Sequence, residues 1–169
     1  MTDPHARRSD FRRRRSPRLR AFDYPAQFAY SITVCTKDRF PYFADEAVGR
    51  EVARCLDERA AQSGYRLVCY CVMPDHVHIL TAPGNPGRAR PLPQFIRQFK
   101  SGVTYRLGKL GMTAAIWQRS FYDHVLRKEE DLEHVATYIL GNPVRKGLVQ
   151  TPEAYPLSRY CQANSRVEW

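Results

Sequence analysis

The stretch Val72-Met-Pro-Asp-His-Val-His-Ile-Leu80 predicts two antiparallel strands joined by a tight turn. Proline and aspartate are favoured in turns, and β-forming residues lie on both sides of them. Residues two apart on a strand point to the same face, so His76 and His78 share one face while Val77 and Ile79 occupy the other. The hairpin therefore presents two neighbouring imidazoles on one side and an apolar surface on the other.

The pair His76 and His78 has two interpretations. Two imidazoles on a rigid strand can bind one divalent metal and leave open positions for oxygen ligands. The alternative is two polar residues on the solvent face of a half-buried strand, which is common because short motifs recur by chance. The residues downstream decide between the two interpretations.

The composition indicates one folded domain with a polyanionic partner. The chain has 169 residues, 43% of them hydrophobic and 12% aromatic, and a formal net charge of +10. Nucleic acid is favoured over a membrane, because no apolar run approaches the roughly 20 residues that span a bilayer. No signal peptide is visible, and the five cysteines lack the Cys-x-x-Cys spacing, so we expect a cytoplasmic, nucleoid-associated protein.

Residues 1–22 form a basic arm that has too few apolar side chains to build a core. We expect this arm to be flexible and to contact phosphates, although a solubilising tail is the alternative. The rest of the chain, 23–169, is predicted to be a single domain. Four of the eight arginines in the arm form an unbroken run: Arg12, Arg13, Arg14 and Arg15.

The periodicity of apolar residues predicts an α+β fold. Alternation indicates strands and helical spacing indicates helices, and their order begins with the β-α-β-β-α-β pattern of a ferredoxin-like sandwich. We therefore expect an antiparallel sheet with helices on one face, an additional C-terminal helix and a loop-rich tail. The predicted strands cover 27–36, 65–73, 76–81 and 121–126, and the predicted helices cover 46–62, 92–110 and 129–141.

The second predicted helix, 92–110, has a basic outer side that includes Arg97 and Lys100. This side is a second candidate for phosphate contacts. An ordinary solvated helix face is the alternative, and the charges alone do not decide between them.

Tyr138 lies on the wrong side of the third predicted helix for a packing role. It falls about 130° from the centre of the apolar stripe of that helix. His134 precedes it by four residues and Asn142 follows it by four, so the three are predicted to line one flank. Asn142 also precedes Pro143, which disfavours helical geometry and would let the amide project from the helix end. The alternative is a surface tyrosine beside two polar residues.

The histidine strand and the tyrosine helix together suggest a chemistry. A phenol is a poor nucleophile at neutral pH, since its pKa is near 10. A metal on His76 and His78 would neutralise phosphodiester oxygens and favour attack on phosphorus, with the amide oxygen of Asn142 as a plausible third ligand. Attack by Tyr138 would give a covalent phosphotyrosine and release a sugar hydroxyl, so that the strand can be rejoined without ATP.

The sequence resembles the single-tyrosine, His-hydrophobe-His transposases of the IS200/IS605 type, and within them the proteins associated with repetitive extragenic palindromes (REP). The resemblance covers about residues 12 to 160 and is specific in the joint spacing of its motifs. These are Met73-Pro-Asp-His-Val-His-Ile-Leu80, Trp117-Gln-Arg-Ser-Phe-Tyr-Asp-His124, Tyr138-Ile-Leu-Gly-Asn-Pro-Val144 and Gly147-Leu-Val149.

The resemblance implies roles for individual residues. It implies that His76, His78 and Asn142 bind Mg²⁺ or Mn²⁺ and that Tyr138 is the nucleophile. It also implies cleavage and rejoining of single-stranded DNA next to a hairpin, such as a REP-like palindrome, through a 5′-phosphotyrosine, by a monomer or a homodimer. Asp75 departs from the asparagine of many relatives and places an extra carboxylate beside the ligands.

Two other functions compete with this one. The first is a single-stranded nucleic-acid-binding protein or repressor without catalytic activity, whose histidines hold a structural metal. The second is a replication or conjugation initiator with the same metal motif, which we expect to carry further domains.

Overall fold

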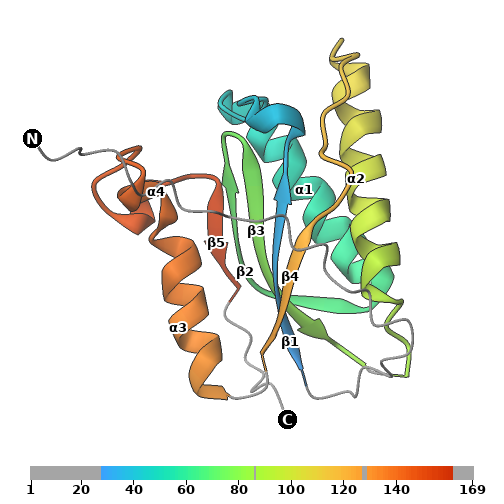
Figure 1. Cartoon of the computed structure of the whole chain (residues 1–169), viewed down its shortest axis with the longest axis vertical. Coiled ribbons are helices and arrows are strands. Elements are labelled where there is room, and N and C mark those ends of the chain that lie inside the picture. Colours follow the sequence, from blue (N-terminus) through green and yellow to red (C-terminus); the bar gives the residue numbers. More distant parts are fainter. Residues whose placement is uncertain (1–27, 86, 127–128, 162–169) are drawn as a thin grey trace, which may run out of the picture.

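The computed structural model describes residues 28–85, 87–126 and 129–161, which form an α+β fold around one sheet (Figure 1). Neighbouring strands are antiparallel throughout, in the order β4-β1-β3-β2-β5. The strands are β1 (Ala29–Cys35), β2 (Tyr65–Met73), β3 (His76–Pro83), β4 (Tyr122–Leu126) and β5 (Ser158–Tyr160).

In the described part of the chain, four α-helices and two short 3-10 helices accompany the sheet. The β1-α1-β2-β3-α2-β4 order confirms the predicted ferredoxin-like pattern. The helices are α1 (Glu46–Ser63), α2 (Leu92–Lys109), α3 (Glu129–Leu140), α4 (Asn142–Arg145), η1 (Lys37–Arg39) and η2 (Pro152–Ala154).

The ends of α1 and α2 follow from local residue chemistry. The carboxylate of Asp45 accepts a hydrogen bond from the N–H of Val48 at 3.0 Å and caps the first turn of α1. Gly64 ends α1 with a φ of 77°, a left-handed conformation that glycine adopts without strain. Gly111 follows α2 in the same region, with a φ of 87°. A capping carboxylate and two left-handed glycines therefore define these helix ends.

Helices α1 and α2 cover one face of the sheet, and the larger core lies between them and the strands (Figure 1). Burying a large apolar side chain of this kind contributes about 1.5–3 kcal/mol. This face therefore provides most of the packing. Its largest buried members include Tyr30, Ile32, Leu56, Phe95, Ile96, Phe99 and Leu107.

Helix α3 covers the opposite face, where the side chains are smaller (Figure 1). The apolar stripe of α3 packs here: Ala136 and Ile139 are buried, and Leu132, Val135 and Leu140 are partly buried against the same cluster. The sheet contributes Ala29, Cys69, Cys71, Met73, Leu80, Ala82 and Leu126. The two cysteines of β2 are small buried core residues.

Two features of the C-terminal part differ from the prediction. The expected loop-rich tail contains β5, a three-residue edge strand paired with β2. Asn142 was predicted to leave helical geometry, but it begins α4 and is buried. The reason is that Pro143 lies in the first turn of α4, where its missing N–H would have no helical partner in any case.

The basic arm 1–22, with Arg12, Arg13, Arg14 and Arg15, lies outside the described residues. Among the helices of the described part of the chain, none combines the length and the apolar character needed to cross a membrane.

Candidate active site

The hairpin of β2 and β3 places His76 and His78 side by side on the α3 face of the sheet. They alternate with Val77 and Ile79, which are buried in the core under α1 and α2. The Nε2 atoms of the two imidazoles lie 3.0 Å apart and face each other. Two nitrogens bound at right angles to one ion, each at about 2.1 Å, would also be about 3.0 Å apart. The pair therefore fits two neighbouring positions of an octahedral metal.

Each imidazole is held from behind through its Nδ1 atom. His76 Nδ1 lies 2.6 Å from Oδ1 of Asp75, and His78 Nδ1 lies 3.0 Å from the hydroxyl of Thr33. Thr33 pairs directly with His78 across β1 and β3, so both point to the same face. When Nδ1 carries the proton and donates it to these oxygens, Nε2 keeps a lone pair for a metal.

The surroundings keep both imidazoles neutral. Burial lowers the pKa of His76, and Asp75 only partly opposes it. Burial, the neighbouring His76 and the charge of Arg145 lower the pKa of His78 to about 3. Burial alone would raise the pKa of Asp75, but His76 and Arg39 together bring it below its usual range. The site therefore combines neutral imidazole nitrogens with an ionised carboxylate behind one of them, a pattern typical of metal-binding histidines.

Asn142 adds a buried amide on the same side of the molecule. The residue is 5% exposed, and its Nδ2 has no hydrogen-bond partner among the described residues. A buried amide group without a hydrogen bond lowers the stability of the folded state, so a binding partner at this position would stabilise the fold. Turning the amide over exchanges nitrogen and oxygen and presents an oxygen ligand of the kind that Mg²⁺ and Mn²⁺ prefer. No group of three or more histidines, cysteines or carboxylates is placed to hold a metal in residues 28–85, 87–126 and 129–161.

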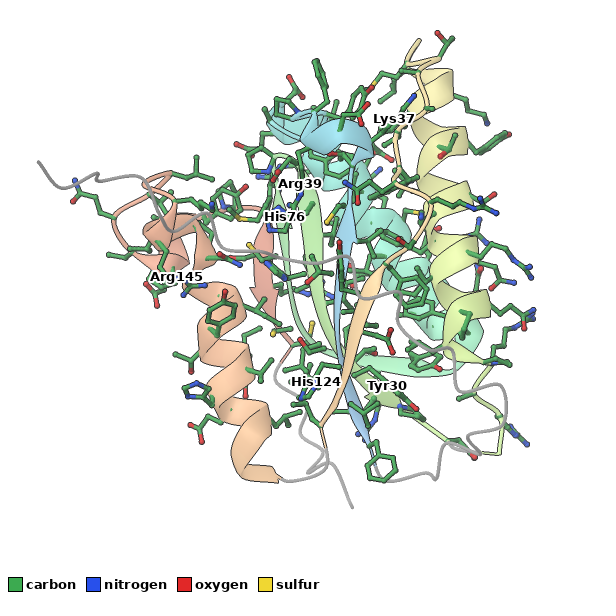
Figure 2. The ribbon with its side chains drawn as sticks, in the orientation of Figure 1. Tyr30, Lys37, Arg39, His76, His124 and Arg145 are labelled. Carbon is green, nitrogen blue, oxygen red and sulfur yellow. The ribbon has the colours of Figure 1, made fainter. Side chains whose placement is uncertain are left out.

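Tyr138 lies on α3, the helix that packs on the histidine face of the sheet. Its side chain is 54% exposed, as its position off the apolar stripe predicted. The guanidinium of Arg145 lies over its ring at 4.1 Å and donates to its carbonyl oxygen at 2.6 Å. The positive charge of Arg145 also lowers the pKa of His78, so this arginine acts electrostatically on the imidazole pair as well. Figure 2 shows His76 between Arg39, which lies in η1, and Arg145, which lies in α4.

The structure brings together only part of the predicted flank of α3. His134 is exposed like Tyr138, whereas Asn142 begins the next helix and is buried. The three residues therefore do not share one exposed surface. The separation follows from Gly141, where the chain turns between α3 and α4.

The two basic residues predicted on α2 have different surroundings. Arg97 is exposed and points away from the core. Lys100 is partly buried, and its ammonium donates to the carbonyl oxygens of Gln118 at 2.5 Å and Arg119 at 3.4 Å. Lys100 thus fixes the segment before β4, while Arg97 is available at the surface.

Three residues of the site were not predicted from the sequence. Thr33 orients His78, Arg39 pairs with Asp75 at 3.3 Å, and Arg145 covers the ring of Tyr138. The alternation of β1 places Thr33 on the face opposite the core, but only the strand register places it beside His78.

The comparisons with known proteins agree with this geometry. Residues 25–142 match the family described as "Transposase IS200 like". The chain is 28% identical over 152 residues to a Haemophilus influenzae protein assigned as a REP-associated tyrosine transposase, covering 82% of each chain. It is 29% identical over 110 residues to the REP-associated tyrosine transposase of Escherichia coli K12, covering 62% of each chain.

A solved structure, that of a REP-associated tyrosine transposase bound to a REP hairpin, shares the fold. The TM-score is 0.70 at 20% sequence identity, over 86% of this chain and 87% of the other. The family match spans most of the chain and includes the histidine pair and the tyrosine. The chain therefore belongs to the IS200-like transposases, the class of single-tyrosine, His-hydrophobe-His enzymes.

Proposed function

We propose that the protein is a metal-dependent endonuclease and strand transferase that acts on single-stranded DNA next to a hairpin. The observation that carries this proposal is the 3.0 Å approach of the His76 and His78 Nε2 atoms, on the sheet face that the helix of Tyr138 covers. Such an arrangement would hold one ion on the face of the sheet that the helix of Tyr138 covers. The relative solved with a REP hairpin supports a palindromic DNA as the substrate.

His76, His78 and Asn142 would hold Mg²⁺ or Mn²⁺. When bound, the ion would neutralise the non-bridging oxygens of the scissile phosphate and make phosphorus more electrophilic. Asp75 and Thr33 keep the two rings in the orientation that this requires, since their oxygens fix the Nδ1 atoms.

Tyr138 is the proposed nucleophile. Its oxygen forms a bond to phosphorus as the bond from phosphorus to the 3′ oxygen breaks, which gives a 5′-phosphotyrosine and a free 3′ hydroxyl. The phenol releases one proton and the departing oxygen takes one up. Reversal by another 3′ hydroxyl rejoins the strand. The guanidinium of Arg145, over the phenol ring, is suited to hold the phosphate against this oxygen.

Basic residues outside the site would bind the rest of the DNA. Arg97 on α2 is exposed and suited to phosphate contacts, and Arg12, Arg13, Arg14 and Arg15 in the arm supply further guanidiniums. For Lys100 we propose a supporting role, since its ammonium already binds two carbonyl oxygens.

A Tyr138→Phe variant tests the nucleophile. We expect it to bind a labelled DNA hairpin with single-stranded flanks as the parent does, and to give no covalent protein–DNA band on a denaturing gel with Mn²⁺. The parent should give this band, and a chelator should abolish it. A parent without the band would favour a binding protein that lacks catalytic activity.

Tyr122→Phe is the matched control. Tyr122 is 65% exposed and pairs with Thr33, which pairs with His78, so its phenol also lies on the histidine face. We expect this variant to form the covalent band normally. If Tyr122→Phe loses the band and Tyr138→Phe keeps it, the nucleophile is on β4 and our assignment is wrong.

A further inference from the structure

The η1 turn, defined here as Lys37 to Phe40, has a backbone conformation that side chains rarely adopt. Asp38 and Arg39 are consecutive and have φ angles of 54° and 56°. Left-handed geometry is strained for residues other than glycine, and it persists only where the surroundings enforce it. The turn is therefore held in this shape at some cost to the fold.

Buried hydrogen bonds enforce this conformation. The hydroxyl of Thr36, which is fully buried, lies 2.8 Å from the carbonyl oxygens of both Phe40 and Asp75. The N–H of Thr36 donates to Asp75, and the N–H of Lys37 donates to Ile116 at 2.7 Å. The turn is thus fixed to the loop that immediately precedes His76 in β3.

The turn exposes an aromatic ring. Phe40 is 57% exposed, and its ring packs against the ring of Tyr42 with the centroids 4.6 Å apart. A phenylalanine held rigid at the surface gains little from the core of its own chain. Unpaired bases stack on such rings in proteins that bind single strands.

The turn lies one side chain away from the paired imidazoles. Arg39 is 3.3 Å from one oxygen of Asp75, and the other oxygen of Asp75 is 2.6 Å from His76. Lys37 and Arg39 are both exposed, and Asp38, also exposed, lies between them in the sequence. In Figure 2, Lys37 and Arg39 lie on the side of His76 away from Arg145.

We propose that the η1 turn binds the DNA strand on the side of the histidine pair opposite Tyr138, with an unpaired base on Phe40 and phosphates on Lys37 and Arg39. Only the identity of the strand, a single-stranded flank of a hairpin, rests on the proposed function. Single-stranded nucleic acid is the ligand that combines an exposed base face with a phosphate at every nucleotide, whereas a duplex hides its base faces.

Binding by a Phe40→Ala variant of the full chain tests the stacking contact. The probe is a fluorescent DNA hairpin with single-stranded flanks, followed by anisotropy without metal so that cleavage does not interfere. We expect about tenfold weaker binding, as for the loss of one stacked base. Tyr105→Ala is the matched control, because Tyr105 is another exposed ring, 65% exposed, that lies on α2 rather than in the η1 turn. An equal loss in both variants would overturn the proposal.

Three further probes locate the contact. The two flanks are removed one at a time. The loss of affinity in Phe40→Ala should disappear when one of the flanks is absent and persist when the other is absent. A loss of affinity that persists when both flanks are absent would contradict the proposal. Blunt duplex DNA should bind Phe40→Ala and the parent equally well, and a loss there would indicate a general phosphate contact instead. If Phe40→Ala weakens the binding of an RNA hairpin of the same sequence more than the binding of the DNA hairpin, the turn is an RNA-binding site.

The charge contact has its own measurement. Plotted against the logarithm of the salt concentration, the logarithm of the binding constant falls along a line. Lys37→Ala should make the slope of this line shallower by about 0.7, the value for one phosphate contact on a single strand. An unchanged slope would remove Lys37 from the proposed surface. These binding results do not depend on the nucleophile, so they stand even if Tyr138→Phe cleaves normally.

Discussion

The two faces of the sheet are built from side chains of different size. Under α1 and α2 lie fully buried rings and branched aliphatic chains such as Phe95, Phe99 and Ile32. Under α3 lie cysteines and alanines, followed at one end by His76 and His78. Large apolar groups stabilise a fold, whereas small ones leave room beside a polar site. The comparison indicates that one face supplies most of the stability and the other the chemistry.

The largest effect on stability is expected on the face of α1 and α2. Phe99 is fully buried between helix and sheet, so Phe99→Ala should lower the free energy of unfolding by about 3–5 kcal/mol. Urea unfolding followed by circular dichroism measures this. Arg97→Ala, an exposed change on the same helix, should stay within about 0.5 kcal/mol. If Phe99→Ala lowers the free energy of unfolding by less than about 1 kcal/mol, the face of α1 and α2 does not supply most of the stability.

The next effect concerns metal binding on the opposite face. With Mn²⁺ at a hundred times its Kd, binding should stabilise the parent by about 2.7 kcal/mol, and His78→Ala should lose this gain. Thermal unfolding with and without Mn²⁺ gives the difference. His124→Ala is the control, since His124 is exposed on β4 and pairs with Ser31, away from the histidine pair. Stabilisation by Mn²⁺ that survives in His78→Ala would place the ion elsewhere.

Most of the fold and the centre of the site were predictable because they depend on local patterns. The alternation of the hairpin placed the two histidines on one face, and the off-stripe position of Tyr138 predicted its exposure. The position of Thr33 beside His78 depends on the register between β1 and β3, which no local pattern encodes. Strand β5 has only three residues and is defined by its pairing with β2 rather than by alternation.

The geometry around Pro143 shows the limit of single-residue rules. A proline disfavours helix at the residue before it, and this favoured a projecting Asn142. The same proline is well tolerated in the first turn of a new helix, and the chain uses this second possibility. The choice between them depends on packing against the rest of the molecule, because Asn142 and Pro143 are both buried.

A smaller effect is expected from the residue that orients His78. Thr33→Val removes the hydroxyl 3.0 Å from Nδ1 and keeps the shape of the side chain. We expect a loss of about 10- to 100-fold in Mn²⁺ affinity with little change in metal-free stability, because such partners fix the ligand orientation. Titration calorimetry measures the affinity, and Thr33→Ser, which keeps the hydroxyl, should restore most of it. Equal affinities for Thr33→Val and the parent would show that the ring is positioned by packing alone.

The smallest effect is a pH dependence confined to the histidine face. The pKa of His78 is lowered to about 3 in the folded chain, against about 6.5 in the unfolded chain, so the unfolded state binds the proton first. Metal-free protein should therefore lose stability as the pH falls below about 6.5, by about 1 kcal/mol at pH 5.5 from this residue. Urea unfolding at pH 7.5 and 5.5 measures the loss, which should be smaller in His78→Ala than in the parent. If the parent and His78→Ala lose the same stability, the titrating groups lie outside the site, and the histidine face makes no special contribution to the pH response.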